Sequence, residues 1–261
     1  EGSAQAVVWC SEYSIMAFCV IFFGYIAQSS LLQYVFYTRS GKTGSNTWKI
    51  QDQKTDSVGQ FWGPPLLSSK PNRAKDHGIL ATCNLLIAGA FAAMTTECSV
   101  RGWNRMCFDR VGVSALLGEL LLAVAFQSVA VYYWHRLMHT KPFYAQFHKL
   151  HHVYKSPEVW DDMYIHPLEA TGYYCILYAP PFLFPTHRSA FLAYMGVMGI
   201  CGVLDHSGVR ACIPGLYNTA DHDNHHLKFE VNYSFPFPYM DLLHGTFDGE
   251  FLGRRYCYRK E

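Results

Sequence analysis

Charge is scarce in this sequence. Only 16% of its 261 residues are Asp, Glu, Lys or Arg, whereas a soluble domain usually carries about 25%. Half of the residues are hydrophobic, yet the mean hydropathy is close to zero at +0.01, so apolar segments must alternate with a substantial polar part. The formal net charge of +1 gives no electrostatic reason to expect nucleic-acid binding. The composition therefore predicts a chain that is partly embedded in a membrane.

Several common motifs are also missing. The nine cysteines form no CxxC pair, which argues against a disulfide framework and against a thiolate zinc site, so most should be small buried hydrophobes. The chain has no HExxH zinc-protease motif and no GxGxxG dinucleotide fingerprint. No signal peptide with a charged start, an apolar centre and a small-residue cleavage site is expected.

Long apolar runs predict the membrane spans. About 18 or more apolar residues suffice to cross a bilayer, and three segments qualify: 13–37, 79–96 and 111–134. Two shorter runs, 170–184 and 190–204, are interrupted by Pro180, Pro181 and Pro185 and predict a helical hairpin that need not cross completely. We therefore expect an all-α integral membrane protein with about three full transmembrane helices plus this hairpin.

The loops predict the orientation of the spans. Residues 38–77 hold seven Lys/Arg, whereas the first twelve residues hold none, so the positive-inside rule places the loop 38–77 in the cytoplasm. The third run then ends at Trp134 on the cytoplasmic side. Glu119 and Gln127 lie inside this run, where polar groups usually face the bundle interior and either join helices or serve a function.

Histidine is concentrated in three clusters of helical spacing. Eleven of the thirteen histidines fall between residues 135 and 226. The clusters read HxxxH, HxxHH and HxxHH, and they contain His135, His139, His148, His151, His152, His222, His225 and His226. Positions i, i+3 and i+4 share one face of a helix, so the histidines of each cluster can converge. Imidazole is the commonest metal ligand and suits iron, zinc and copper.

Eight imidazoles are more than one ion with an open position needs, and about enough for two ions. Each HxxHH can give one histidine to one metal and two to another, or bridge a pair of sites. His166 and His206 could complete the set. Nearby carboxylates are expected to orient the imidazoles rather than bind metal, and the candidates are Asp161, Asp162, Glu169, Asp205, Asp221 and Asp223. The sequence thus predicts a dimetal site in a histidine-rich cap at the cytosolic end of the spans.

In these residues the chain resembles the fatty acid hydroxylase superfamily, which includes sterol C4-methyl oxidases, sterol C5 desaturases and sphingoid-base hydroxylases. The resemblance covers about 132–255 and includes the three clusters, the His166-Pro-Leu-Glu169 and His206-Ser-Gly208 boxes, Asn232-Tyr233, Asp241 and Gly245-Thr246. We accordingly divide the chain into membrane-spanning helices over 1–131 and a hydroxylase-like region over 132–261. Between His152 and His166 the chain departs from the sterol oxidases, because Trp160-Asp161-Asp162 stands where small apolar residues are expected.

The resemblance implies a membrane-bound non-haem di-iron oxidase that uses O₂ to attack a C–H bond of a lipid. It implies two Fe ions (Zn in the purified protein is an alternative) held by the clustered eight histidines and His206. His166 is implied as a further ligand or a neighbour of the ligands, and Asp205, Asp223, Glu169 and Asp241 as groups that support them. Cytochrome b5 and an NAD(P)H reductase would supply electrons, and the implied location is the endoplasmic reticulum membrane with the metals in the cytosol.

Three functions remain open at this point. A sterol is the first choice of substrate by the resemblance of the boxes to C4-methyl oxidases. A sphingoid-base or fatty acid hydroxylase or desaturase is the alternative enzyme. A non-catalytic membrane subunit that retains the fold within a larger complex is the alternative of another class. A metal hydrolase built on His222-Asp223 ranks below these three, because it would leave the cluster at 148–152 unexplained.

Overall fold

The computed structural model describes residues 10–39, 47–51 and 71–258. Helices dominate it, and the strands form three short two-stranded ladders. The helices are α1 (Glu12–Leu32) with its continuation η1 (Gln33–Arg39), α2 (Pro71–Val100), α3 (Val113–Met138), α4 (Lys141–Gln146), η3 (His148–Val153), η4 (Asp161–Met163), α5 (Pro167–Leu177), α6 (Pro180–Leu183), α7 (Arg188–Asp205), α8 (Thr219–Lys228) and α9 (Tyr239–His244). The ladders pair β1 (Met106–Cys107) with β2 (Thr186–His187) in parallel, and β3 (Cys212–Ile213) with β4 (Tyr217–Asn218) and β5 (Gly249–Phe251) with β6 (Arg254–Tyr256) in antiparallel fashion.

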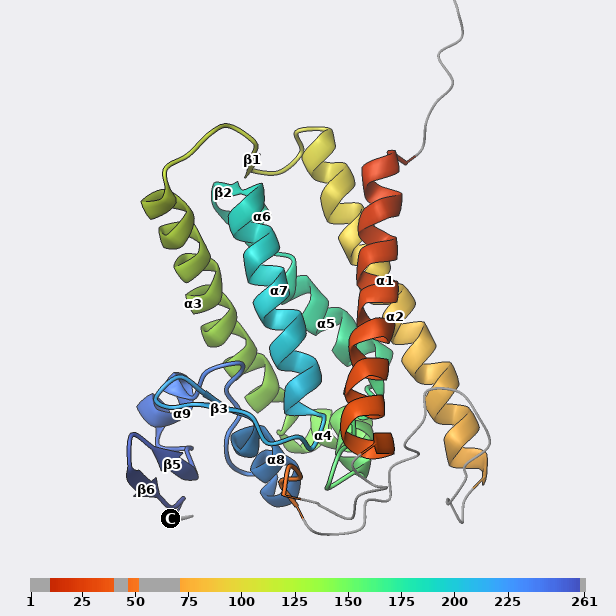
Figure 1. The fold of residues 1–261 in the computed structure, drawn as a ribbon, viewed down its shortest axis with the longest axis vertical. Coiled ribbons are helices and arrows are strands. Elements are labelled where there is room, and N and C mark those ends of the chain that lie inside the picture. The colour runs from red at the N-terminus through yellow and green to blue at the C-terminus, as the bar shows by residue number, and fades with distance from the viewer. Residues whose placement is uncertain (1–9, 40–46, 52–70, 259–261) are drawn as a thin grey trace, which may run out of the picture.

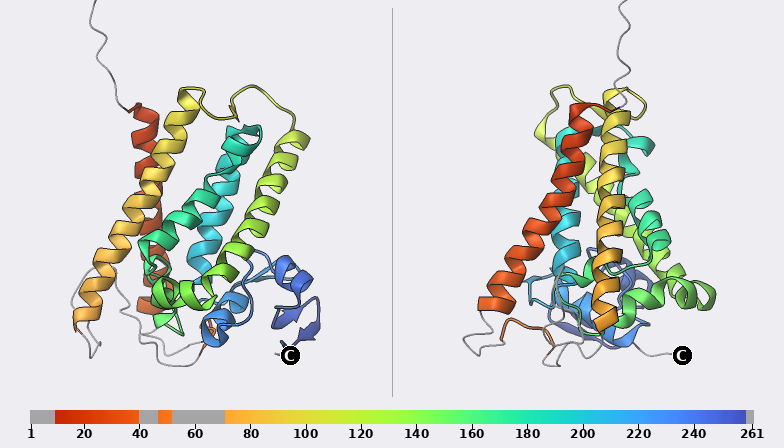
Figure 2. Two further views of the ribbon diagram at one scale, coloured as in Figure 1. Left: turned by 180° about the vertical axis from the view of Figure 1, so that it is seen from behind. Right: turned by 90° about the vertical axis from the view of Figure 1, so that its right-hand side faces the viewer.

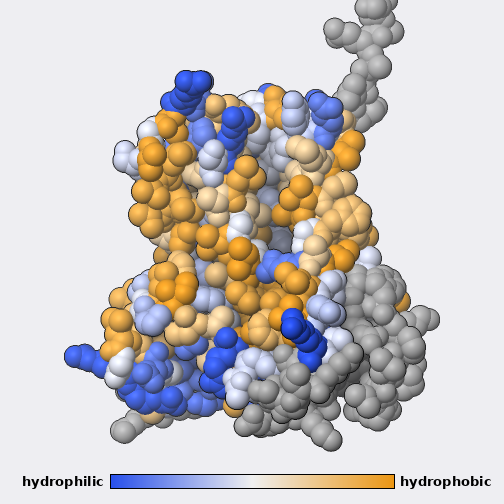
Figure 3. All heavy atoms as spheres, in the orientation of Figure 1, coloured by the Kyte–Doolittle hydropathy of each residue, from blue (hydrophilic) through white to orange (hydrophobic). Residues whose placement is uncertain are grey.

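Four helical segments are long and apolar enough to cross a membrane: 12–39, 77–100, 113–138 and 188–205. They expose large apolar side chains outward, such as Val20, Leu121 and Leu192, which are 63, 67 and 68% exposed. An apolar surface of this extent belongs in lipid rather than in water. Hydrophobic residues cover the helical part of the molecule in Figure 3, and hydrophilic ones gather toward its two ends. The chain is therefore an all-α membrane protein, as the sequence predicts.

Polar contacts pin the apolar helices to one another. The Ser11 hydroxyl caps α1 by accepting from Ser14 N, and Glu97 near the end of α2 accepts from Ser11 N (2.8 Å) and from the Ser14 hydroxyl (2.7 Å). These bonds hold the start of α1 against the end of α2, and the two helices pack along their length. The remaining spans, α3 and α7, pack against each other, and α5 lies between them and α2 (Figures 1 and 2).

The predicted hairpin at 170–204 extends to the end of the bundle opposite the histidines. The ladder of β1 with β2 joins its turn to the loop between α2 and α3, which lies at that end (Figure 1). The prolines interrupt only the first arm, where α5 stops at Leu177 and Pro180 opens the short α6. The second arm, α7, is an unbroken helix and is itself long enough to span, so the structure has four candidate spans where the sequence suggested about three.

The two polar residues in the third span join helices. Gln127 Oε1 accepts a hydrogen bond of 2.7 Å from the Tyr194 hydroxyl of α7. Glu119 Oε2 accepts one of 2.6 Å from His187 N at the start of α7. Of the two expectations for these residues, the structure supports the helix-joining one.

A short strap, residues 47–51, ties the segment between α1 and α2 to the histidine-rich end. Ile50 N donates to Gly208 O at 3.0 Å, and Gln51 Nε2 donates to Asp223 Oδ2 at 2.7 Å and to Lys155 O at 2.9 Å. The strap therefore lies beside the loop after His206 and beside α8. The rest of the basic loop, 40–46 and 52–70, with Lys42, Lys54 and Lys70, lies outside the described residues.

Candidate metal centre

Two membrane helices deliver histidines directly to the polar end of the bundle. His135 lies in the last turn of α3, and His139 is the residue that ends that helix. His206 ends α7 in the same way. Because both helices are fixed by their packing in the bundle, these three imidazoles have positions set by the membrane-spanning part of the fold.

The other two clusters come from the cap. His148, His151 and His152 lie on η3, which is a 3₁₀ helix and not the α-helix that their spacing suggested; short connecting segments commonly wind in this tighter form. His222, His225 and His226 lie on α8, a true α-helix whose first turn is capped by Asn218 Oδ1 accepting from Ala220 N at 3.1 Å.

The structure collects nine histidines into two compact groups. Within each group one ring nitrogen per residue lies within 4.8 Å of all the others. The first group contains His135, His139, His148, His152 and His225, and the second contains His151, His206, His222 and His226. Each HxxHH segment divides its histidines between the two groups, which is the sharing that the spacing suggested. The nine are the clustered eight together with His206.

Backbone carbonyls hold several of these rings by their Nδ1 atoms. His135 Nδ1 bonds to Tyr233 O at 2.9 Å, His225 Nδ1 to Val231 O at 2.6 Å and His226 Nδ1 to Tyr154 O at 3.2 Å. A carbonyl only accepts, so the proton of each neutral ring sits on Nδ1 and Nε2 carries a free lone pair. This is the tautomer that binds a metal through Nε2.

The Nε2 atoms of each group point at one another. In the first group His225 Nε2 lies 3.2 Å from His139 Nε2 and 3.1 Å from His152 Nε2. In the second group His206 Nε2 lies 3.0 Å from His151 Nε2 and 2.9 Å from His222 Nε2. Lone pairs that converge on a buried point suit a cation between them, and an all-imidazole donor set suits iron, zinc or copper. The residues present thus fit a pair of metal ions.

Burial keeps the imidazoles neutral. Removal from water lowers the pKa of the cap histidines below the ordinary value, and the charges of neighbouring histidines lower it further. This holds for His139, His148, His151, His152, His222, His225 and His226. Since a metal needs the unprotonated ring, the environment holds the ligands in the form that binds.

Two carboxylates contact imidazoles of the two histidine groups directly. Glu169 Oε1 lies 2.5 Å from His148 Nδ1, and both side chains are buried. Asp162 Oδ1 lies 3.2 Å from His206 Nδ1. Asp161, from the same Asp pair, instead contacts His77 Nε2 on α2 at 3.2 Å. Glu169 thus has the position expected of a group that orients a ligand.

Among the other predicted supporting carboxylates, Asp241 is connected to a grouped histidine through one intermediate residue, whereas Asp205 and Asp223 bond to other side chains. Asp241 accepts from Tyr233 N at 2.9 Å and so fixes the loop whose carbonyl holds His135. Asp205 accepts from the Tyr217 hydroxyl at 2.7 Å, and Asp223 accepts from Gln51. Neither of these last two forms a hydrogen bond to a histidine within the described part of the chain.

His166 is not brought to either group. It precedes α5 and caps it, with Nδ1 accepting from Leu168 N at 3.2 Å, and its ring lies against Phe147. Sequence reasoning also missed several contributors: the carbonyls of Tyr154, Val231 and Tyr233, and Gln51 of the strap. Backbone carbonyls carry no residue-type signal, so no motif could have revealed them.

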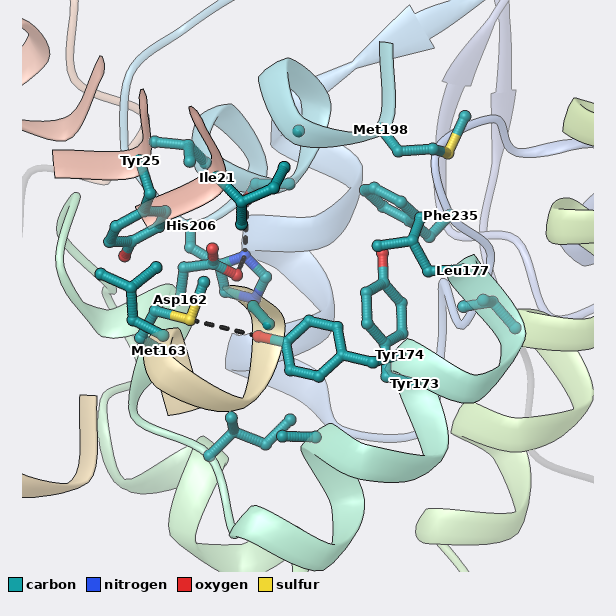
Figure 4. Close-up of a pocket in the computed structure, with 18 of the residues that line it drawn as sticks. Ile21, Tyr25, Asp162, Met163, Tyr173, Tyr174, Leu177, Met198, His206 and Phe235 are labelled. Carbon is teal, nitrogen blue, oxygen red and sulfur yellow. Dashed lines mark hydrogen bonds and ion pairs between the residues drawn. The ribbon is translucent and has the colours of Figure 1, made fainter. Parts of the chain in front are cut away.

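An apolar cavity of about 360 Å³ lies between the spans and ends at the histidines. Side chains of α1, α2, α3, α5 and α7 line it, and so do His135, His148, His151, His206 and His222 from both groups. Figure 4 shows part of its wall, with Leu177, Met198 and Phe235 on one side and Tyr25, Asp162 and His206 on the other.

The cavity wall is thin between α1 and α7. Gly24 of α1 and Gly196 and Gly199 of α7 line the cavity, and a methyl group added at any of them would meet no atom within 4 Å. The surface is hollowed between these two helices in Figure 3. The gap lies among the membrane-spanning helices, and the cavity behind it extends to the histidines.

The sequence is similar to those of several known proteins. The fatty acid hydroxylase family model matches residues 120–246. Human lathosterol oxidase is 26% identical over 156 residues, covering 57% of this chain and 52% of that protein. Human fatty acid hydroxylase domain-containing protein 2 is 33% identical over 129 residues, covering 49% and 38%. A Δ7-sterol 5(6)-desaturase of Gibberella zeae is 31% identical over 127 residues, covering 48% and 36%.

The chain thus spans about half or less of the length of these relatives, and no solved structure matches it. The matched region begins inside α3 and ends just after α9, so it contains all nine grouped histidines. Residues 120–246 thus match the fatty acid hydroxylase family, and the proteins similar to this region include sterol oxidases and desaturases of the same superfamily.

Proposed function

We propose that this chain is a membrane-bound non-haem di-iron oxidase that uses O₂ and external electrons to oxidise a C–H bond of a lipid, with a sterol as the substrate. The observation that carries the proposal is the union of two all-histidine groups with the end of an apolar cavity that opens toward lipid. Neither feature alone would suffice, because a metal site can be purely structural and an apolar cavity can bind lipid without reacting with it.

Two iron ions bound to these groups would supply the activation of O₂ that attack on an unactivated C–H bond requires. His135, His139, His148, His152 and His225 would hold one ion, and His151, His206, His222 and His226 the other. Imidazole ligands are neutral, so the ions would keep most of their positive charge. The chain has no dinucleotide fingerprint, which is why we propose cytochrome b5 and an NAD(P)H reductase as the electron source.

The chain's own residues hold the substrate and exclude water. The apolar walls of the cavity, from Ile21, Leu177 and Met198 among others, bury the hydrocarbon, and the carbonyls behind the rings keep each Nε2 directed inward. A rigid site of this kind sets which carbon comes closest to the metals. Hydroxylation and desaturation begin with the same hydrogen abstraction, so either outcome fits the site.

Sterols are the proposed substrates because of the relatives. Their names include a lathosterol oxidase and a sterol desaturase, and the sequence boxes resemble those of C4-methyl oxidases. A sphingoid base or fatty acid is the alternative substrate. We propose the endoplasmic reticulum membrane as the location, with the basic segment 38–77 and both histidine groups on the cytosolic side.

The test combines metal analysis with lipid profiling. The full chain, purified from cells grown with iron, should contain about two irons, and cells that express it should convert one sterol into a product that depends on O₂. His225→Ala should lower the iron content and abolish the product. Asp109→Asn, which changes an exposed residue of the loop between α2 and α3, is the matched control and should preserve both.

If the full chain purified from cells grown with iron holds one zinc or no metal, the di-iron proposal is refuted. If His225→Ala loses metal yet leaves every lipid unchanged while a membrane complex falls apart, the chain is a non-catalytic subunit. If the changing lipid is a sphingoid base or fatty acid, the oxidase proposal stands and the sterol assignment fails.

A further inference from the structure

The apolar cavity has one polar wall. Two acidic side chains line the cavity, Asp162 and Glu169, and they lie beside different histidine groups. Glu169 Oε1 is engaged by His148, so this carboxylate has a clear structural use. Asp162 contacts His206, and the structural use of its carboxylate is less obvious.

Asp162 is not required to orient His206. The His206 ring has one proton on Nδ1, and Gly202 O accepts it at 2.9 Å, closer than Asp162 Oδ1 at 3.2 Å. No other hydrogen-bond donor reaches the Asp162 carboxylate within the described residues. The side chain is 19% exposed while it lines the cavity, so this exposure is toward the space that a ligand would fill. A carboxylate in apolar surroundings needs donors, and here the protein supplies at most a shared one.

Tyr25 adds a second polar atom to this wall of the cavity. Its side chain is only 8% exposed and lines the same cavity, and its hydroxyl interacts with the Ser29 hydroxyl one turn further along α1. Figure 4 shows Tyr25, Asp162 and His206 together on one side of the cavity. A tyrosine hydroxyl both accepts and donates, so Tyr25 can accept from Ser29 and still donate to a bound molecule.

We propose that Asp162 and Tyr25 bind the hydroxyl group of a lipid alcohol, which enters head first between α1 and α7. The hydroxyl donates to the Asp162 carboxylate and accepts from the Tyr25 hydroxyl. The hydrocarbon then lies against Leu177, Met198 and Phe235 and reaches back toward the gap at Gly24 and Gly199. The inference rests on the proposed function, and it names the feature by which the substrate is chosen.

Two consequences define the substrate class. A free fatty acid is disfavoured, because its carboxylate would face Asp162 with like charge. Since Asp162 touches His206, the bound hydroxyl lies beside the second histidine group, so the oxidised carbon is within a few bonds of the hydroxyl. The enzyme would therefore modify lipid alcohols near their polar end and not in a remote part of the hydrocarbon.

The experiment measures binding, so it does not depend on turnover. Radiolabelled cholesterol is bound to the full metal-loaded chain in detergent micelles and displaced by unlabelled cholesterol, by its 3-methyl ether or by stearate. A hydrogen bond to a charged group favours the free alcohol over the ether by about tenfold. Stearate should compete no better than the ether. Asp162→Leu should bring the alcohol-to-ether ratio to about one with the metal content unchanged, and Tyr25→Phe should lower the ratio in part.

Tyr178→Phe, which removes another tyrosine hydroxyl from the cavity wall, is the matched control and should leave the ratio at the wild-type value. Asp162→Asn keeps the size of the side chain and serves if the leucine variant does not fold; it should lower the ratio about threefold. Equal affinity of the wild type for alcohol and ether overturns the head-group site but leaves the oxidase proposal intact. Loss of metal from Asp162→Leu or Asp162→Asn also overturns it, because Asp162 would then act through His206.

Discussion

The close approach of α5 to α3 gives a sharp prediction about stability and metal binding. Gly172 of α5 lies against the indole of Trp134, the residue before His135. A methyl group at position 172 would overlap Trp134 Cζ2 and Cη2 and lie 2.9 Å from Cε2. Gly172→Ala therefore forces a rigid ring to move. Overpacking of this kind costs about 1–3 kcal/mol, and the better helix propensity of alanine returns about 0.5–1 kcal/mol. The net loss is about 1–2 kcal/mol.

Thermal unfolding of the purified chain in detergent measures this loss. A protein of this size should lose about 2–8 °C in Tm for that change. The metal content should fall as well, because a displaced Trp134 would shift the neighbouring His135. Gly118→Ala on α3 is the matched control: a methyl group there meets nothing within 4 Å, so stability should stay equal or rise slightly.

A double variant separates the overlap from other effects. Trp134→Phe removes the benzo ring that the methyl group meets, so Gly172→Ala combined with it should cost less than Gly172→Ala alone. The reasoning is refuted if Gly172→Ala is as stable as Gly118→Ala, or if Trp134→Phe gives no relief.

Three further predictions follow from the site. His206→Ala should lower the metal content measured by plasma mass spectrometry, whereas His166→Ala should keep it, because His166 lies outside both groups; loss of metal from His166→Ala would restore that residue as a ligand. Metal occupancy after dialysis should stay flat through pH 6.5 and fall only at lower pH, because burial holds the pKa of His148 and His226 well below the ordinary 6.5 and a proton must displace the metal to bind; occupancy that falls already above pH 6.5, or that rises on acidification, would contradict this. Gln51→Ala removes the strap's bonds to Asp223 and Lys155 and should cost about 1 kcal/mol of unfolding free energy, while an unchanged Tm would mean that the strap adds no stability.

The membrane-spanning helices are the part of the fold that could be predicted from the sequence. Apolar runs long enough for a bilayer identify α1, α2 and α3 without ambiguity, because hydropathy alone decides them. The hairpin was harder. Pro180 and Pro181 suggest an incomplete crossing of the membrane. They interrupt only the first arm, however, and α7 alone is long and apolar enough to span.

The histidine spacing predicted which residues gather but not how they divide. Nothing in HxxHH states that His151 and His152 face different groups, since that depends on where η3 lies relative to α8. The 3₁₀ winding of η3 was also hidden, because the same spacing fits an α-helix. The sequence also could not decide the role of His166. A histidine before a proline suits a helix cap as well as a metal, and only the fold shows that His166 caps α5 and lies outside both groups.

The division of neighbouring histidines between the two groups has a consequence for assembly of the centre. His151 and His152 are adjacent, as are His225 and His226, and in each pair one ring serves one group and one ring the other. An ion in the first group would therefore fix the backbone of η3 and α8, and with it three of the four ligands for the second ion. The entropy of ordering those segments is lost once and not twice. Loading should accordingly be cooperative, so that chains with a single ion are rare beside chains that hold none or two.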